Sequence, residues 1–325
     1  MFYFPGWVKR PGTNWDPPWD QIKLYPDREP LLGWYPEGEV WVAEKQIQWL
    51  YDYGVNFLIF DWYWTKDNKP GLEHALQAYL KAKNSNLVKY TILWANHSDV
   101  PESLDQFTAM VDFWINNYFN KKQFMTIDGK PVVYIFSAEI LRDNAKKFGA
   151  STNDLLNISR NIAIKAGYKG IYFVACTQAI YSLVNEYIPS SGYDAISAYN
   201  YHRGYSGTYE KGGLSINFAE LASGYKQSWE WILENSSLPY FLPVSAGWSK
   251  NPWGSHTPHD ASFSDPLSFR KHLVEAKSML DRYPDKTKNT IVICAWNEFG
   301  EGSYIEPTKK WKFQYLNAIK DVFRK

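Results

Sequence analysis

Two glutamates, Glu298 and Glu301, follow an apolar run in the segment IVICAWNEFGEGSYIEP (residues 291–307). The run is rich in β-branched residues and predicts a strand buried on both faces. Two carboxylates just after such a strand are hard to place in a core, because burying an unpaired carboxylate is costly or raises its pKa. Gly300 and Gly302 permit a tight turn that directs both carboxylates to one place. Cleavage of a glycosidic bond needs such a pair, one carboxyl giving a proton and the other taking one or attacking. The alternative is a solvated loop with two surface glutamates.

The succession of apolar runs predicts which elements position these glutamates. Strands are expected at residues 2–5, 55–60, 90–93, 131–136, 171–174, 194–198, 241–245 and 291–295. Helices are expected at residues 41–53, 72–83, 101–119, 155–166, 179–187, 218–233, 266–280 and 310–323. Strands that alternate with helices pair in parallel through right-handed crossovers, and this number of units closes most simply into a (β/α)8 TIM barrel. An open doubly wound sheet is the alternative, although no glycine-rich phosphate loop follows the first strand. We expect one domain over residues 1–325.

Polar and aromatic residues collect at the C-terminal ends of the predicted strands, where the sites of TIM barrels lie. The candidates for substrate binding are Trp7, Asp61, Trp62, Tyr63, Trp94, Asn96, His97, Tyr199, Tyr201, His202, Trp248 and Asn297. Among them, the candidates for contacts with sugar hydroxyls are Asp61, His97, Tyr199, Tyr201 and His202, and the candidates for stacking on sugar rings are Trp94 and Trp248. Each also has a structural alternative, such as capping a helix, packing in the core or, for Asn297, orienting Glu298. Two long loops, residues 9–39 and 201–213, are expected to set specificity.

Composition narrows the class of partner. The formal net charge is +1, from 35 basic and 34 acidic residues, which gives no electrostatic reason to expect nucleic acid as a partner. Aromatic residues make up 18% of the chain, a composition that suits a carbohydrate partner. No apolar run approaches the roughly 20 residues that cross a bilayer, so membrane insertion is not expected. No signal peptide is visible, and the compartment is left open because a removed secretion signal would fit the same sequence.

Other chemistries have weaker support in the sequence. His256, His259 and Asp260 are close together but lack a third ligand at a recognised spacing, so no metal and no cofactor are expected. Cys176 and Cys294 fall in or near buried strands and are expected to be buried free thiols. Glu306 is expected at the N-terminus of the last helix, where the helix dipole favours a carboxylate.

The segment WNEFGEGSYIEP, with IFDWYW and LWANH upstream, resembles the glycoside hydrolase family 99-like group. That group includes endo-α-mannosidases and proteins described as WbsX-type glycosyltransferases, and the resemblance covers essentially the whole chain. It implies a (β/α)8 barrel and a pair of motif glutamates that act with retention at the anomeric carbon. It also implies that Glu301 is the general acid and base. Glu298 would then be either the nucleophile or the base that lets the sugar 2-hydroxyl attack, giving a 1,2-anhydro intermediate. The endo-mannosidases typically carry a histidine just before the second glutamate, where this chain has Gly300, so the sugar stays open.

The sequence therefore predicts a metal-independent retaining glycoside hydrolase, expected to be monomeric, that acts on a glycan, with α-linkage implied by the resemblance. One alternative is a WbsX-type glycosyltransferase, which would need a site for a sugar nucleotide. The other is a non-catalytic glycan-binding barrel, in which both glutamates would be dispensable.

Overall fold

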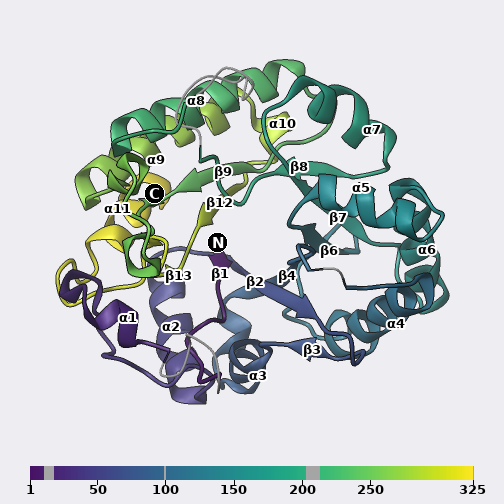
Figure 1. Cartoon of the computed structure of the whole chain (residues 1–325), viewed down its shortest axis with the longest axis horizontal. Coiled ribbons are helices and arrows are strands. Elements are labelled where there is room, and N and C mark those ends of the chain that lie inside the picture. The colour runs from purple at the N-terminus through teal and green to yellow at the C-terminus, as the bar shows by residue number, and fades with distance from the viewer. Residues whose placement is uncertain (11–17, 99, 203–212, 325) are drawn as a thin grey trace.

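The computed structural model describes residues 1–10, 18–98, 100–202 and 213–324, in which strands and helices alternate. The helices lie around the outside of the strands (Figure 1). The alternating strands are β1 (Phe2–Tyr3), β2 (Phe57–Trp64), β4 (Lys89–Trp94), β6 (Lys130–Ile135), β7 (Tyr172–Cys176), β8 (Ala195–Ser197), β9 (Leu242–Ser245) and β12 (Ile291–Cys294). Each predicted strand is present, with bounds that differ by a few residues.

The helices depart further from expectation. They are α1 (Asp20–Lys23), α2 (Val40–Asp52), α3 (His74–Lys81), α4 (Leu104–Trp114), α5 (Ala138–Lys147), α6 (Thr152–Lys165), α7 (Ile188–Ser190), α8 (Phe218–Asn235), α9 (Pro266–Arg282), α10 (Pro284–Thr287) and α11 (Gln314–Phe323). Helix α5 was not predicted, since its sequence is mostly polar; it begins where the Ser137 side chain accepts a hydrogen bond from the Ile140 N–H. Two predicted α-helical stretches contain π-helical turns instead, η3 (Ile115–Phe119) and η4 (Ser182–Tyr187).

Short strands and 3₁₀ turns lie in the connections between the main strands and helices. They are the strands β3 (Pro70–Gly71), β5 (Thr126–Ile127), β10 (Gly247–Trp248), β11 (Ser262–Phe263), β13 (Asn297–Glu298) and β14 (Ser303–Tyr304), and the 3₁₀ turns η1 (Pro26–Arg28), η2 (Ser85–Leu87), η5 (Asn251–Trp253) and η6 (Pro258–Ala261). In the described residues, no helix is long and apolar enough to cross a membrane.

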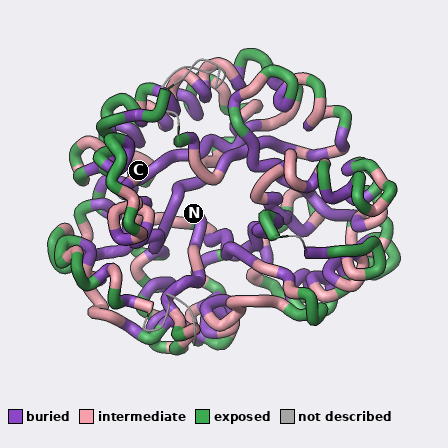
Figure 2. The backbone as a smooth tube through the Cα atoms, viewed as in Figure 1, coloured by how far each residue is buried: buried purple, intermediate pink, exposed green. Residues whose placement is uncertain are grey.

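The main sheet is parallel. Its strands pair in the order β1-β2-β4-β6-β7-β8, and β9 pairs with β12 in parallel as well. An isolated parallel bridge between Ile196 and Tyr240 links the two groups on one side. On the other side, the Trp296 N–H donates a 2.8 Å hydrogen bond to the Phe2 carbonyl. The strands are buried for most of their length, while the helices carry the exposed residues on their outer side (Figure 2).

Side chains alternate between the two faces of this sheet, as the period of a strand requires. Along β2, Ile59 belongs to an apolar cluster made only of residues outside the helices, together with Phe2, Leu93 and Val292. Its neighbour Phe60 belongs instead to the large cluster that the sheet forms with the helices. We call the first the inner face and the second the outer face. Cys176 and Cys294 are buried free thiols on the inner face, as predicted.

Candidate active site

A hydrogen-bonded trio joins the ends of three strands. The Tyr199 hydroxyl, just after β8, lies 2.9 Å from Asp61 Oδ2 in β2 and 2.9 Å from Glu298 Oε1 after β12. A phenol has one proton and can donate to only one of these carboxyl groups. The other contact is a hydrogen bond only when that carboxyl is protonated and donates to the phenolic oxygen. With both contacts formed as hydrogen bonds, Asp61 and Glu298 share one carboxyl proton.

Burial explains why a proton is retained there. Asp61 and Glu298 are each only 6% exposed, and burial raises the pKa of both well above the usual range for a carboxyl group. The negative charge of Glu301 raises the pKa of Glu298 and of Asp61 further, whereas the hydrogen bond from Tyr199 acts in the opposite direction. Among the described residues, Asp61 Oδ1 is buried and has no hydrogen-bond partner. An acceptor left open in this way is available to a ligand hydroxyl or a proton.

Glu301 has a different environment from Glu298. Its side chain is 23% exposed, and its Oε1 lies 3.7 Å from the ammonium of Lys250. Burial raises the pKa of Glu301, and the charge of Lys250 offsets part of that effect. The two glutamates thus differ as an acid–base pair should: one buried and bonded to a phenol, the other reachable from solvent and beside a cation.

Arg28 holds the turn between the two glutamates through hydrogen bonds. This residue was not predicted from the sequence. Arg28 is 8% exposed, and its guanidinium donates to the carbonyls of Phe299 and Ser249 and to the Ser249 hydroxyl. The Ser249 N–H in turn donates to the Glu301 carbonyl at 2.7 Å. Gly302 is required here, because its φ of +70° is left-handed and a Cβ would lie 2.7 Å from the Ser249 nitrogen.

The Asn297 side chain links the segment after β12 to the N-terminal segment of the chain. It accepts from the Phe4 N–H, donates to the Phe4 carbonyl, and donates at 3.2 Å to Glu37. Trp7 donates from its indole N–H to the Asn297 carbonyl and stacks on Trp19, with ring centroids 4.2 Å apart. Because Trp7 is 1% exposed, the structure makes it a packing residue that supports the segment of Glu298. Glu37 is a second positioning residue that the sequence did not indicate.

Several predicted site residues lie away from the trio. Trp62 and Trp94 are 2% and 1% exposed on the outer face, so neither ring is open to a sugar. Tyr201 is also on the outer face, with its hydroxyl 2.9 Å from that of Tyr240. Asn96 is fully buried and joins β4 to the end of β6 through two hydrogen bonds with the Ser137 backbone. These four residues hold the scaffold in this structure.

Other predicted residues lie around the trio or at its rim. Tyr63 is half-buried, and the charges of Asp61 and Glu298 add to burial in raising its pKa. His97 is exposed, with its ring edge-on to Tyr63 at 5.8 Å. His202 is exposed as well and lies edge-on to the half-buried Trp248, with ring centroids 4.3 Å apart. The structure brings these residues to the end of the sheet where the carboxyl groups lie.

Asp260 has a structural role among the residues considered for a metal. Its carboxylate accepts hydrogen bonds from the Lys250 backbone, from Ser255 and from Thr257, which closes the loop after β10. No group of three or more His, Cys, Asp or Glu side chains in the described part of the chain could hold a metal ion. Within the two loops expected to set specificity, residues 11–17 and 203–212 lie outside the described residues.

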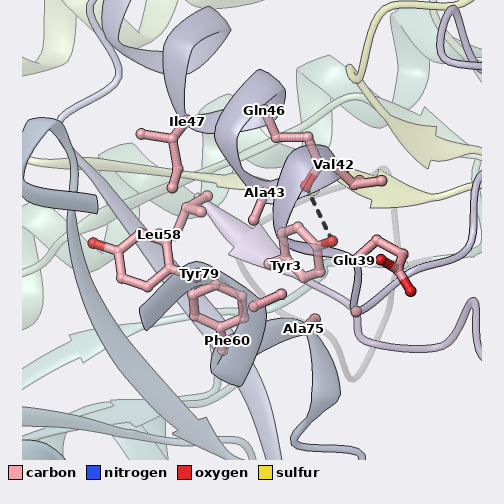
Figure 3. Close-up of a pocket in the computed structure, with 12 residues that line it drawn as sticks. Tyr3, Glu39, Val42, Ala43, Gln46, Ile47, Leu58, Phe60, Ala75 and Tyr79 are labelled. Carbon is pink, nitrogen blue, oxygen red and sulfur yellow. Dashed lines mark hydrogen bonds between the residues drawn. The ribbon is translucent and has the colours of Figure 1, made fainter. Parts of the chain in front are cut away.

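The prediction for Glu306 was wrong. The last helix begins only at Gln314, and Glu306 is instead 1% exposed beneath α2. The Tyr35 hydroxyl donates to it at 2.8 Å and Gln46 donates at 3.3 Å. Gln46 also accepts from Tyr3 at the edge of a small pocket on the outer face (Figure 3). A proline after a glutamate misled the prediction, because the chain runs on through a buried turn before helix α11 starts.

Comparisons with known proteins agree with the motifs. The sequence matches the family described as glycosyltransferase WbsX over residues 24–319, and no curated protein matches it. Among solved structures, the GH99 endo-α-mannosidase from Bacteroides thetaiotaomicron is similar with a TM-score of 0.66 at 16% sequence identity, covering 99% of this chain and 94% of that chain. A glycoside hydrolase-like protein is similar with a TM-score of 0.68 at 16% identity, covering 92% of this chain and 89% of the other. At this identity the likeness establishes a shared fold. Because the family match spans most of the sequence, the chain belongs to the family described as glycosyltransferase WbsX.

Proposed function

We propose that the chain is a metal-independent glycoside hydrolase that cleaves an α-linked glycan with retention, using Glu298 and Glu301. The observation that carries the proposal is the hydrogen-bonded trio of Asp61, Tyr199 and Glu298, with Glu301 beside it in a different environment. Retaining chemistry needs one carboxyl that gives a proton and one that attacks or takes a proton. The similar mannosidase structure, which is described as a GH99 endo-α-mannosidase, supports the α-linkage.

The proposed mechanism assigns each group one task. Glu301, which is partly exposed, protonates the leaving oxygen and later removes a proton from water. Asp61 keeps the shared proton and donates to the Tyr199 oxygen, so that the Tyr199 hydroxyl donates to Glu298. Glu298 is then ionised, and acts on the anomeric carbon directly or deprotonates the sugar 2-hydroxyl. Besides Tyr199, the predicted contacts with exposed or half-exposed surface are Tyr63, His97, His202 and Trp248, and we assign them to the substrate.

We also infer that the strands close into a (β/α)8 barrel. The bridge from Ile196 to Tyr240 and the hydrogen bond from Trp296 to Phe2 supply contacts on both sides of the β9–β12 pair. The inner-face cluster includes Phe2, Phe241 and Val292 together, which supports an interior shared by strands of both groups. Closure would bring the ends of β2, β8 and β12 to one mouth, as the trio requires.

The test is the release of new reducing ends from a panel of α-linked oligosaccharides. Glu298→Gln and Glu301→Gln should each lower kcat by roughly 10²- to 10⁴-fold while sugar binding in calorimetry is retained. Glu306→Gln is the matched control, a buried glutamate in the same segment that the mechanism does not use, and it should keep the wild-type rate. Full turnover in either site variant would refute the assignment. NMR of the first-formed product reports whether the anomeric configuration is retained.

The family description favours one second candidate, a glycosyltransferase. It predicts tight binding of a sugar nucleotide and transfer of its sugar to an acceptor. A glycan-binding barrel without activity predicts instead that sugar binds equally well to wild type, Glu298→Gln and Glu301→Gln, with no turnover in any of them.

A further inference from the structure

A group of basic and aromatic side chains lies next to Glu301. We call it the Trp248 cluster: His202, Trp248, Lys250 and His259. The Lys250 ammonium is 5.8 Å from the centre of the Trp248 ring, and the His259 ring stacks on Trp248 at 5.8 Å. The ring centroids of His202 and His259 are 6.0 Å apart. The members come from the segment after β8 and from the β10–β11 hairpin, which meet beside the end of β12.

The hairpin that carries the cluster is fixed before any ligand arrives. Strands β10 and β11 pair in antiparallel fashion, with Trp248 opposite Ser262. The Asp260 carboxylate accepts from the Lys250 N–H at 2.7 Å and from the Thr257 N–H at 2.8 Å. A site whose side chains are held in place loses less conformational entropy on binding. The hairpin therefore has the rigidity of a recognition element.

Lys250 has donors to offer a ligand. Its ammonium carries three N–H groups, and its contact with Glu301 Oε1 at 3.7 Å is too long for a good hydrogen bond. The side chain is 43% exposed, so a ligand can reach it. A cation at this place also opposes the proton-donor role of Glu301, because it lowers that group's pKa. A ligand anion that binds the ammonium would weaken this effect and favour the acid form.

His259 offers a second polar contact. It is 6% exposed, and its Nδ1 lies 2.9 Å from the Ser215 carbonyl, so Nδ1 carries the proton and donates. Nε2 is then an acceptor in the neutral ring, and it is buried with no partner in the described part of the chain. A sugar hydroxyl is the natural donor to such an atom. The half-buried Trp248 adds apolar surface of the kind on which a sugar ring stacks.

The charges in and around the cluster favour a ligand with a single negative charge. Lys250 is the cluster's one permanently charged member, because the others are a tryptophan and two histidines. Glu298, which the proposed mechanism holds ionised, stands close by and would repel a dianion such as a diphosphate. A monovalent carboxylate on a sugar fits this balance.

We propose that the Trp248 cluster is a subsite for a uronic acid, with the sugar carboxylate on Lys250, the ring against Trp248 and a hydroxyl donating to His259. The substrate would thus be an acidic glycan. This inference rests on the proposed function, since it assigns the substrate class of the same site. The subsite lies on the side of Glu301, next to the bond that is cleaved.

The test compares α-linked uronic-acid oligosaccharides with the same oligosaccharides after reduction of each carboxyl group to a hydroxymethyl group. Activity is measured as kcat/KM from new reducing ends, and binding as Kd in calorimetry with Glu301→Gln. The wild type should prefer an acidic probe over its reduced counterpart by about tenfold or more. Lys250→Met, which keeps the apolar stem near Trp248, should remove that preference, and Lys250→Arg should keep most of it.

Lys310→Met is the matched control, because Lys310 also lies over a tryptophan, Trp311 at 4.8 Å, and pairs with Asp27 on the surface. It should leave the preference unchanged. Cleavage of reduced probes at least as fast as acidic ones would overturn the subsite and leave the hydrolase intact, as would a preference that survives Lys250→Met. Acid-selective binding that Lys250→Met abolishes, without turnover, would support the subsite and remove the proposed function. Binding of a sugar nucleotide with no binding of either probe would overturn both.

Discussion

Glu306 gives the sharpest test of the energetics of this fold. Its carboxyl group is 1% exposed and accepts from Tyr35 and Gln46. Burial raises its pKa from 4.5 to about 8, and the charge of Glu37 adds to this, although both hydrogen bonds act against it. In the unfolded chain the group returns to its usual pKa. Stability must therefore depend on pH through this one residue.

The sign and size of this pH dependence follow from the linkage between proton binding and folding. Below pH 4.5 the group is protonated in both states, and its contribution does not change with pH. Between pH 4.5 and about pH 8 only the unfolded chain loses the proton, so stability falls as pH rises, by about 1.4 kcal/mol per pH unit. The total fall is roughly 4–5 kcal/mol and levels off above the folded pKa. Glu306→Gln removes it, at a cost of about 1 kcal/mol because an amide keeps one acceptor oxygen where the carboxylate has two.

The free energy of unfolding should be measured in urea from about pH 5 to about pH 9 for the wild type and Glu306→Gln. The variant should be slightly less stable at the acidic end and more stable by roughly 3 kcal/mol at the alkaline end, so the two curves cross. Asp61 and Glu298 titrate in both proteins, and their contributions cancel in the difference. Glu234→Gln, on the exposed side of α8, should change stability by less than about 0.5 kcal/mol throughout. A difference that does not change with pH would refute the reasoning.

Two further predictions concern the site. Tyr199→Phe removes the hydrogen bond that lowers the pKa of Asp61 and Glu298, so the acidic limb of the kcat/KM profile should move to higher pH by about one unit; an unmoved limb would exclude the proposed proton sharing. Gly300→Ala places a Cβ 2.0 Å from the Trp253 ring, so Trp253 must move, with a loss of about 1–3 kcal/mol in urea unfolding and a change in tryptophan fluorescence. Gly213→Ala, where a Cβ would meet no described residue within 4 Å, is the control, and equal losses in both variants would contradict the packing argument.

The ends of the strands could be predicted from the sequence to within a few residues. The alternation of side chains between the two faces of a strand was not used to decide which residues face the site. In IFDWYW, the alternation of a strand sends Asp61 and Tyr63 to the same face as Ile59 and sends Trp62 to the other. The same rule separates Leu93, on the inner face, from Trp94, on the outer face. A period-two reading would therefore have assigned Trp62 and Trp94 to packing against the helices. Residue type alone suggested Trp62 as a substrate contact and Trp94 as a stacking platform, whereas the alternation of side chains along each strand assigns both to the outer face.

The residues that position the glutamates could not be read from sequence in the same way. Arg28 reaches Phe299 from 271 positions earlier in the chain, in a region that the sequence presents only as a long connection. Lys250 had one local signal, since it follows Trp248 by two residues beyond a strand end, but its contact with Glu301 depends on how two loops fold. Such partners are chosen by tertiary structure, and neither propensity nor periodicity encodes them.

The two activities that the comparisons suggest share more chemistry than their names imply. A retaining enzyme divides its reaction into two steps, and the intermediate is released by whichever hydroxyl reaches the anomeric carbon second. If that hydroxyl belongs to water the enzyme is a hydrolase, and if it belongs to a sugar the enzyme transfers a glycosyl group. In the proposed mechanism the trio and Glu301 would serve either outcome, because neither the acid nor the base distinguishes the two hydroxyls. The donor is the better criterion: a glycan donor fits the single cation of Lys250 beside a Glu298 that the proposed mechanism holds ionised, whereas a sugar nucleotide brings a diphosphate that Glu298 would repel.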